Sequence, residues 1–319
     1  MATDLSLLRI AVLVPCYNEE LTVAAVVSDF RKSLPSAEIF VFDNNSTDKT
    51  AENAIAAGAI VHHVAIAGKG NVVRRMFADV EADIYIMADG DATYHAPSAP
   101  SLVQKLIDDN LDMVVGVRQH DSNDAYRAGH QFGNKMLTGT MSRIFGGKFT
   151  DMLSGYRAFS RRYAKSFPAM AHGFETETEL TIHALELRML YGEVITPYGV
   201  RPEGSTSKLR TYSDGARILK TIVGLFAVER PLQFYSLLGT ASMATALVLA
   251  LPIFLTYAKT GLVPRFPTAI LSSGLGIIGV MLLTTGLILE TVTIGRREAK
   301  RLCYLSTPGL SQKRPRNTE

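Results

Sequence analysis

The sequence has no tryptophan and only two cysteines, Cys16 and Cys303, among its 319 residues. The first absence excludes every motif that needs an indole ring. Two cysteines so far apart argue against a disulfide framework, and neither has metal-ligand spacing. We therefore expect two free thiols in a reducing compartment.

The N-terminus lacks the basic and apolar stretches of a signal peptide, so we expect residue 1 to lie in the cytoplasm. A net charge of only +3 gives no reason to expect a nucleic-acid partner.

Charge is almost absent from two stretches near the C-terminus. Phe234–Ala258 and Thr268–Thr293 carry one formal charge between them, at Glu290. Each stretch is long enough to cross roughly 30 Å of hydrocarbon, and the short connector Lys259–Pro267 predicts an antiparallel hairpin. Basic residues are denser on the outer sides of the two stretches than in the connector. The positive-inside rule therefore predicts a multi-pass protein of the cytoplasmic membrane, with both termini in the cytoplasm.

The first 120 residues repeat an apolar strand followed by a loop and a helix. The expected strands are Arg9–Pro15, Ile39–Phe42, Ile60–Val64, Ile84–Ala88 and Met113–Val117. Such alternation predicts an α/β domain with a mostly parallel sheet and helices on both faces. Ligands of these sheets bind at the carboxyl ends of the strands.

The whole chain divides by composition into four expected parts. These are an α/β domain at 1–210, an interfacial amphipathic helix at 211–233, a transmembrane hairpin at 234–295 and a basic cytoplasmic tail at 296–319. Within the first part, Ala128–Gly147 is amphipathic. It fits either a helix that faces the core or one that lies on the bilayer surface.

The strongest local signal is Asp89-Gly90-Asp91, directly after an apolar strand. Two carboxylates at a strand end can hold a hard cation such as Mg²⁺ or Mn²⁺, which in turn can bind the phosphates of a nucleoside diphosphate. Asp89 and Asp91 are therefore predicted as metal ligands and catalytic residues.

Other polar clusters follow the neighbouring strands. We expect them to bind the nucleotide through Pro15, Tyr17, Asn18, Glu19, Asp43, Asn45, Lys69 and Asp89. A tyrosine ring and a carboxylate can hold a base and a ribose, and Gly68-Lys69-Gly70 at a helix start suits a phosphate. Each cluster alone is also ordinary turn chemistry, so the prediction depends on four clusters at four strand ends.

These motifs resemble those of family 2 glycosyltransferases with the GT-A fold, and in particular the polyisoprenyl-phosphate glycosyltransferases. The matching segments are V-P-C-Y-N-E-E, D-N-N-S-T-D-K-T, G-K-G, D-G-D, Ser154-Gly155-Tyr156-Arg157 and Ser207-Lys208-Leu209. The chain departs from the family pattern at two positions. Asn44 stands where the family often has Asp, and Thr93 stands where it often has Gln. Thr93 lies two residues after Asp91, so the second departure concerns the expected metal site.

The resemblance implies a Rossmann-like GT-A domain that transfers a sugar, with inversion, from a nucleotide-sugar to a polyisoprenyl phosphate. UDP-sugars and undecaprenyl phosphate are favoured, and a tetramer is implied. An anionic acceptor needs cations, and the expected ligands of its phosphate are Arg118, Arg127, Arg157, Arg201 and Lys208. Asp151 and Glu177 are expected as a base or as ligands of sugar hydroxyls. For Glu177, a role in favouring the helix dipole is the alternative.

Three other functions compete with this prediction. A transferase that extends a lipid-linked glycan or polysaccharide through a sugar hydroxyl is one, although processive members carry a Gln-x-x-Arg-Trp motif that a chain without Trp cannot have. A nucleotidyltransferase would need a Gly-rich loop after the first strand, which is absent. A catalytically inactive membrane scaffold is the third, and the intact Asp89 and Asp91 argue against it.

Overall fold

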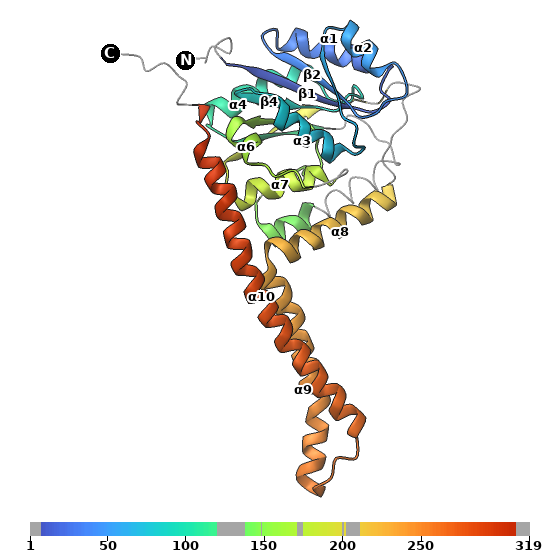
Figure 1. The fold of residues 1–319 in the computed structure, drawn as a ribbon, viewed down its shortest axis with the longest axis vertical. Coiled ribbons are helices and arrows are strands. Elements are labelled where there is room, and N and C mark those ends of the chain that lie inside the picture. The colour runs from blue at the N-terminus through green and yellow to red at the C-terminus, as the bar shows by residue number, and fades with distance from the viewer. Residues whose placement is uncertain are drawn as a thin grey trace, which may run out of the picture. The chain divides into compact units, whose positions relative to one another are not determined.

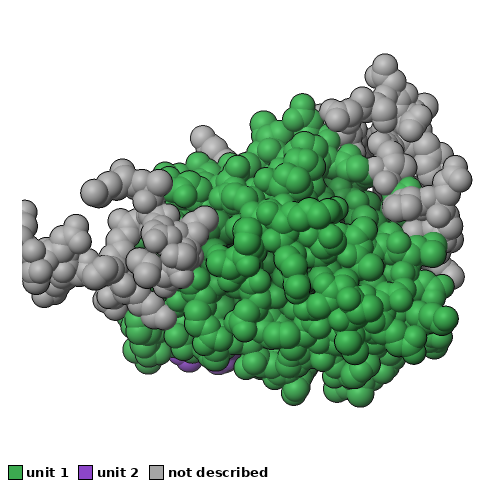
Figure 2. Space-filling model, turned by 90° about the horizontal axis from the view of Figure 1, so that it is seen from above, with its two compact units in different colours: residues 1–219, 300–319 green, residues 220–299 purple. Residues whose placement is uncertain are grey.

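The structure, a computed structural model, describes residues 8–119, 138–147, 149–170, 175–199, 201 and 211–310. It divides into two compact units. The first unit comprises residues 1–219 and 300–319, shown in green in Figure 2, and the second comprises residues 220–299.

In its described part, the first unit contains a seven-stranded sheet with the strand order β3-β2-β1-β4-β6-β5-β7. The strands are β1 (Ile10–Cys16), β2 (Glu38–Asp43), β3 (Ile60–His63), β4 (Ile84–Met87), β5 (Met113–Gln119), β6 (Arg157–Ser160) and β7 (Tyr191–Pro197). Only β6 runs against its neighbours, being antiparallel to both β4 and β5. The predicted mostly parallel α/β sheet is therefore confirmed.

Helices cover both faces of this sheet (Figure 1). They are α1 (Val23–Ser33), α2 (Thr50–Ala56), α3 (Lys69–Asp79), η2 (Ala96–Ser98), α4 (Ala99–Asp108), α6 (Arg161–Ser166) and α7 (Thr176–Glu186). Residues of α1 and α4 share one buried cluster with alternate residues of β1 and β4. On the other face α3 packs with α6 and α7.

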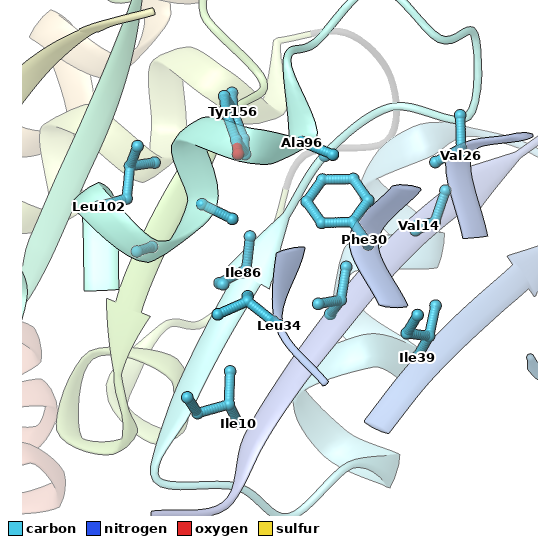
Figure 3. Close-up of a cluster of buried hydrophobic side chains, with 14 of the residues drawn as sticks. Ile10, Val14, Val26, Phe30, Leu34, Ile39, Ile86, Ala96, Leu102 and Tyr156 are labelled. Carbon is cyan, nitrogen blue, oxygen red and sulfur yellow. The ribbon is translucent and has the colours of Figure 1, made fainter. Parts of the chain in front are cut away.

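The main core follows from the two-residue period of the strands. Ile10 and Val14 of β1 and Ile86 of β4 point to the face covered by α1, where Phe30 lies among them (Figure 3). The Phe30 ring meets the Tyr156 ring edge to face, with centroids 6.2 Å apart. Because these strands are buried on both faces, the sequence shows them as continuous apolar runs.

The second core, on the opposite face, holds a buried histidine. His183 of α7 is only 2% exposed, and the rings of Tyr163 and Phe167 lie 5.3 and 5.4 Å from it. Its Nε2 lies 3.1 Å from the Ser166 hydroxyl, and its Nδ1 has no hydrogen-bond partner among the described residues. Burial, with a smaller contribution from the charge of Lys300, lowers the pKa of His183 from 6.5 to about 3. The imidazole is therefore neutral at neutral pH.

This histidine predicts a specific pH dependence of stability. Unfolded His183 gains a proton below pH 6.5, whereas the folded protein excludes that proton down to about pH 3. Stability is therefore lost as the pH falls through this window, by about 1.4 kcal/mol per pH unit. Thermal unfolding of the full chain in detergent at several pH values measures the loss, and His183→Leu should flatten the curve. His95→Leu, at an exposed site, is the control. Parallel curves for wild type and His183→Leu would contradict the prediction.

The helices of this unit resolve two local sequence patterns. Ser46 and Thr47 are residue types that suit a helix cap, but α2 begins only at Thr50. Ser46 and Thr47 instead bind Asn18, so their polar groups join two loops rather than cap a helix. Of the amphipathic stretch 128–147, residues 138–145 are helical, with Met141 and Phe145 buried. This described part faces the core, and residues 128–137 lie outside the described residues.

The second unit is a helical hairpin. The C-terminal half of α8 (Thr211–Glu229), all of α9 (Pro231–Thr260) and most of α10 (Phe266–Ser306) belong to it. Both α9 and α10 are long and apolar enough to cross a membrane, with a mean hydropathy of 2.0 in each. A Cβ on Gly239 would lie 2.9 Å from the Gly279 carbonyl oxygen, so glycine lets the two helices approach closely. A Cβ on Gly274 or Gly276 would have no neighbour within 4 Å.

The C-terminal segment differs from the expected basic tail. Residues 296–306 continue helix α10, and the chain from Lys300 onward belongs to the first unit. There Lys300 pairs with Glu186 at 3.1 Å, and the Tyr304 hydroxyl donates to Asp112 at 2.8 Å. Lys300, a basic residue of this segment, therefore has a structural partner. Residues 311–319 lie outside the described residues.

Candidate active site

The sheet topology brings the predicted site together. β1, β2 and β4 are parallel neighbours, and the ends of β1 and β2 are in register, with Cys16 beside Asp43. The antiparallel strand β6 starts where β4 ends, since Arg157 pairs with Met87. The segment Ser154–Tyr156 therefore lies at the same edge of the sheet as Asp89, although more than 60 residues separate the two in the sequence.

Side-chain hydrogen bonds join the loops at this edge in pairs. Asn18 in the first loop donates its N–H to Ser46 Oγ in the second at 2.9 Å. Thr22 donates its hydroxyl to the Gly90 carbonyl at 2.6 Å, which ties the first loop to the Asp89–Asp91 turn. A Cβ on Gly90 would overlap Cys16 Sγ, at 2.5 Å. The edge is thus one preorganised surface rather than separate flexible turns.

Asn44, one of the two departures from the family pattern, has a structural role here. Its amide nitrogen donates to the carbonyls of Val64 and Ile66 at 2.9 and 2.8 Å, and its Oδ1 accepts the Gly68 N–H at 2.7 Å. An aspartate could not donate to the two carbonyls. Asn44 therefore fixes the loop that leads into Lys69.

Asp91 is buried, with 3% of its surface exposed. Its Oδ1 accepts hydrogen bonds from the Thr93 N–H at 3.1 Å and hydroxyl at 2.6 Å. Its other oxygen, Oδ2, forms an ion pair with Arg201. Thr93, the second departure from the family pattern, thus orients Asp91.

Asp89 forms an ion pair with a largely buried lysine, Lys69. Lys69 Nζ lies 2.6 Å from Asp89 Oδ1 and 2.5 Å from Glu177 Oε1. Burial acts to lower the pKa of Lys69, but the charges of Asp89 and Glu177 outweigh it and raise the pKa above its usual value. Lys69 is therefore a permanent cation next to the expected metal ligand.

A second ion pair lies at the end of β5. Arg118 binds Asp151 with two hydrogen bonds, Nε to Oδ2 at 2.7 Å and Nη2 to Oδ1 at 2.8 Å. The Tyr198 ring centroid lies 5.5 Å from the guanidinium carbon. Burial acts to lower the pKa of Arg118, but the hydrogen bonds that it donates to Asp151 outweigh burial and raise the pKa. The arginine expected to bind the acceptor phosphate and the acid expected to act as a base thus engage each other.

Arg157 does not lie where the sequence analysis placed it. Its side chain is fully buried, at 0% exposure. The guanidinium donates to the carbonyls of Met152, Ser154 and Glu177 at 2.5, 2.9 and 3.2 Å, and to the Thr181 hydroxyl at 3.0 Å. Its expected role as a ligand of the acceptor phosphate is wrong, because the site loop itself occupies its donors. Arg157 anchors that loop to α7.

The expected nucleotide ligands differ in accessibility. Tyr17 is 47% exposed and Pro15 is half-buried. Glu19 and Asp43 are buried, and Asp43 Oδ2 lies 3.2 Å from His63 Nδ1. Asn45 donates its amide to the Ala65 carbonyl at 2.6 Å. Tyr17 is thus open to a base, while Asn18, Asp43 and Asn45 also shape the loops.

Two expected acceptor ligands, Arg127 and Lys208, lie outside the described residues.

The sequence analysis missed Thr22 and Tyr94, which the fold brings into the site. Tyr94 accepts the Gly155 N–H at 2.8 Å, and its ring lies tilted against Tyr156 and edge to face with Tyr198, with centroids 5.3 and 5.4 Å apart. Only its place five residues after Asp89 could have pointed to it; for Thr22 we find no signal in the sequence.

The donor set fits a hard divalent cation. Asp89 and Asp91 offer carboxylate oxygens, the ligands that Mg²⁺ and Mn²⁺ prefer. No group of three potential metal-binding side chains is found among the described residues. Two carboxylates would suffice for a cation that takes its other ligands from a diphosphate and water, as Mg²⁺ commonly does.

Comparison with known proteins identifies the family. The family model described as Glycosyl transferase family 2 matches residues 11–167. The glycosyltransferase AglJ of Haloferax volcanii is 32% identical over 296 residues, which cover 92% of this chain and 97% of that protein. A dolichyl-phosphate hexose transferase of the same organism is 27% identical over 221 residues, covering 69% of this chain and 95% of that protein.

Solved structures agree with this relationship. Glucosyl-3-phosphoglycerate synthase from Mycobacterium tuberculosis, in complex with Mn²⁺, UDP-glucose and phosphoglyceric acid, aligns with a TM-score of 0.58 at 25% identity. The alignment covers 69% of this chain and 80% of that one. The strand-end site and the long match to AglJ lead to one conclusion: the chain belongs to glycosyl transferase family 2 and is a glycosyltransferase.

Proposed function

We propose that this enzyme transfers a hexose from a nucleoside-diphosphate sugar, most simply a UDP-sugar, to a polyisoprenyl phosphate at the cytoplasmic face of a membrane. The observation that carries the proposal is the presence, in one chain, of the Asp89 and Asp91 site and of two helices long enough to span a bilayer. A relative named a dolichyl-phosphate hexose transferase supports the lipid acceptor, and a neighbour bound to UDP-glucose supports the donor.

The donor would lie along the strand ends, with its base toward Tyr17 and Asp43. Its diphosphate would lie near Asp89 and Asp91, with Lys69 and Arg201 as nearby cations. A divalent cation held by the two aspartates would offset the charge that builds on the departing diphosphate.

The chemistry of the acceptor fits the pairing of both expected bases, Asp151 and Glu177, with cations. An ionised phosphate oxygen attacks the anomeric carbon, and the bond from that carbon to the nucleoside diphosphate breaks, with inversion. No proton has to be removed from such a nucleophile, so alignment and charge neutralisation suffice. A hydroxyl acceptor would need a base, whereas Asp151 and Glu177 are each engaged by a cation. This difference favours the phosphate acceptor over a glycan hydroxyl.

The charge distribution supports the proposed topology. Arg230, Arg296, Arg297 and Arg301 lie at the outer ends of the two long helices, against Lys259 and Arg265 at the connector. The positive-inside rule places the outer ends, and with them the catalytic unit and both termini, in the cytoplasm. A tetramer is proposed from the family resemblance alone.

The test is direct transfer by the full chain in detergent. Radiolabelled UDP-glucose, UDP-galactose, UDP-N-acetylglucosamine and GDP-mannose are each incubated with undecaprenyl phosphate and Mn²⁺ or Mg²⁺, and the organic phase is counted. We expect one donor to give a labelled lipid only when a divalent cation is present.

Undecaprenol, which has the same chain without the phosphate, is the matched control acceptor. It should give less than about 1% of the label, because it lacks the anionic nucleophile and the charge that the site arginines bind. Equal labelling of undecaprenol, or label that appears only in a water-soluble glycan, would overturn the proposed acceptor.

A further inference from the structure

A buried acid lies behind the predicted metal ligand. Glu177 contacts Lys69 at 2.5 Å, and Lys69 contacts Asp89 at 2.6 Å. Along this row the side-chain exposure rises from 5% at Glu177 through 11% at Lys69 to 29% at Asp89. Glu177 thus reaches the surface of the site only through the lysine, which excludes it from direct contact with a sugar hydroxyl in this arrangement.

Three elements hold this row in place. Lys69 is the first residue of α3, and the preceding Gly68 has a φ of +119°, which a glycine tolerates. Glu177 lies in the first turn of α7, whose Glu177 carbonyl also binds Arg157. Asp89 follows β4. Because each member comes from a different element, the fold determines their spacing and rotamer changes cannot easily alter it.

The third side of the cluster is closed by backbone. A Cβ on Gly155 would lie 3.0 Å from Asp89 Oδ2, 3.2 Å from the Tyr94 hydroxyl oxygen and 3.3 Å from Lys69 Nζ. The Gly155 segment therefore lies directly over the carboxylate, while Lys69 holds its other oxygen. Asp89 has little freedom to turn.

Burial of the Glu177 carboxylate lowers the stability of the fold, and a role in this site would explain why the residue is there. Lys69 and Asp89 alone would be a neutral pair, and Glu177 gives the trio a net charge of −1. Its second oxygen, Oε2, is buried without a hydrogen-bond partner among the described residues, an arrangement that penalises folding. A divalent cation and Lys69 would repel each other across Asp89, and a buried carboxylate behind the lysine offsets that repulsion.

We infer that Glu177 is a positioning residue, which acts through Lys69 to hold the Asp89 carboxylate ready for the diphosphate of the donor and its cation. The inference rests on the proposed function for the identity of the donor. It replaces the expectation that Glu177 is a base. It also gives Lys69 a second role besides attracting phosphate, as the link between the interior charge and Asp89.

The experiment measures binding, without the lipid. Mn²⁺ affinity is measured by electron paramagnetic resonance in the presence of UDP, on the full chain in detergent, for wild type, Glu177→Gln and Glu179→Gln. Glu179 is a buried acid on the same helix that accepts the Met170 N–H at 2.8 Å, and it is the matched control. We expect Glu177→Gln to weaken Mn²⁺ binding about tenfold and Glu179→Gln to change it less than twofold.

A double variant separates positioning from a general structural role. If Glu177 acts through Lys69, Glu177→Gln should have little further effect in a Lys69→Met background. Unchanged Mn²⁺ affinity of Glu177→Gln, or full additivity with Lys69→Met, would overturn the inference. If Glu177→Gln does not fold, Glu177→Asp, which withdraws the charge from Lys69 without removing it, is read in the same way.

The two proposals fail differently. A wild-type chain that binds Mn²⁺ and UDP but labels no polyisoprenyl phosphate would overturn the acceptor and leave Glu177 as inferred. A wild-type chain that binds UDP without Mn²⁺ would remove the cation from the proposed function. In that event UDP affinity replaces Mn²⁺ affinity in the same comparison of variants.

Discussion

Replacing Asp91 with asparagine should reduce sugar transfer about a thousandfold while leaving the protein folded. The substitution keeps the shape of the side chain and the acceptor for the Thr93 N–H, but it removes the charge that pairs with Arg201. Loss of one group that neutralises charge in a transition state costs about 10²- to 10³-fold, and loss of a metal ligand belongs at the upper end. The turnover number of the full chain with its best donor and undecaprenyl phosphate measures the effect.

The matched control for this change is Asp109→Asn, an exposed aspartate that pairs with Lys105 at 3.0 Å. It should leave the turnover number within about twofold, since exposed pairs contribute little. A thermal unfolding midpoint for Asp91→Asn near that of wild type would show that the loss of activity is not caused by unfolding. Retention of more than about a tenth of the activity by Asp91→Asn would refute the assignment of Asp91 to the reacting centre.

Replacing Arg157 with methionine should destabilise the catalytic unit by about 3 kcal/mol, because three buried carbonyls lose their donor. The site loop would lose its anchor to α7 at the same time. For a unit of this size the loss corresponds to a fall of about 10 °C in the unfolding midpoint. Thermal unfolding of the full chain, followed by a probe of the catalytic unit, gives the measurement.

Arg75→Met is the corresponding control. Arg75 lies on α3 with its side chain 57% exposed and pairs with Asp79 four residues later. Its loss should cost less than about 1 kcal/mol. If Arg157→Met unfolded at the wild-type temperature but bound the acceptor lipid less tightly, the original expectation of a phosphate ligand would be restored and the structural role assigned here would fail.

The sequence predicted the fold well because the sheet is buried on both faces. The strands at 10–16 and 84–87 appear as apolar runs, and polar residues follow each of them within two positions. Helix boundaries were less certain, as α2 illustrates. Ser46 and Thr47 have the composition of a helix cap, yet they bind Asn18 in a loop about 30 residues away in the sequence. A local pattern cannot reveal a distant competitor for the same hydrogen-bonding groups.

The site shows the same limit for charged residues. An arginine in the sequence carries the same charge whether it faces a ligand or the interior, so Arg118 and Arg157 received the same role. The structure separates them: Arg118 is paired with Asp151 at the end of β5, while Arg157 is fully buried beneath the loop that precedes β6. Burial depends on what packs over a side chain, which is a tertiary property.

The sequence by itself determined the kind of chemistry. Carboxylates after an apolar strand, a lysine at a helix start and two nearly uncharged stretches of membrane length are local properties of the chain. Only the tertiary structure decided how the charges pair, because Lys69, Asp89 and Glu177 come from three elements joined by the sheet order. Electrostatic interactions depend on distance and on exclusion of water, and neither is defined until the chain has folded.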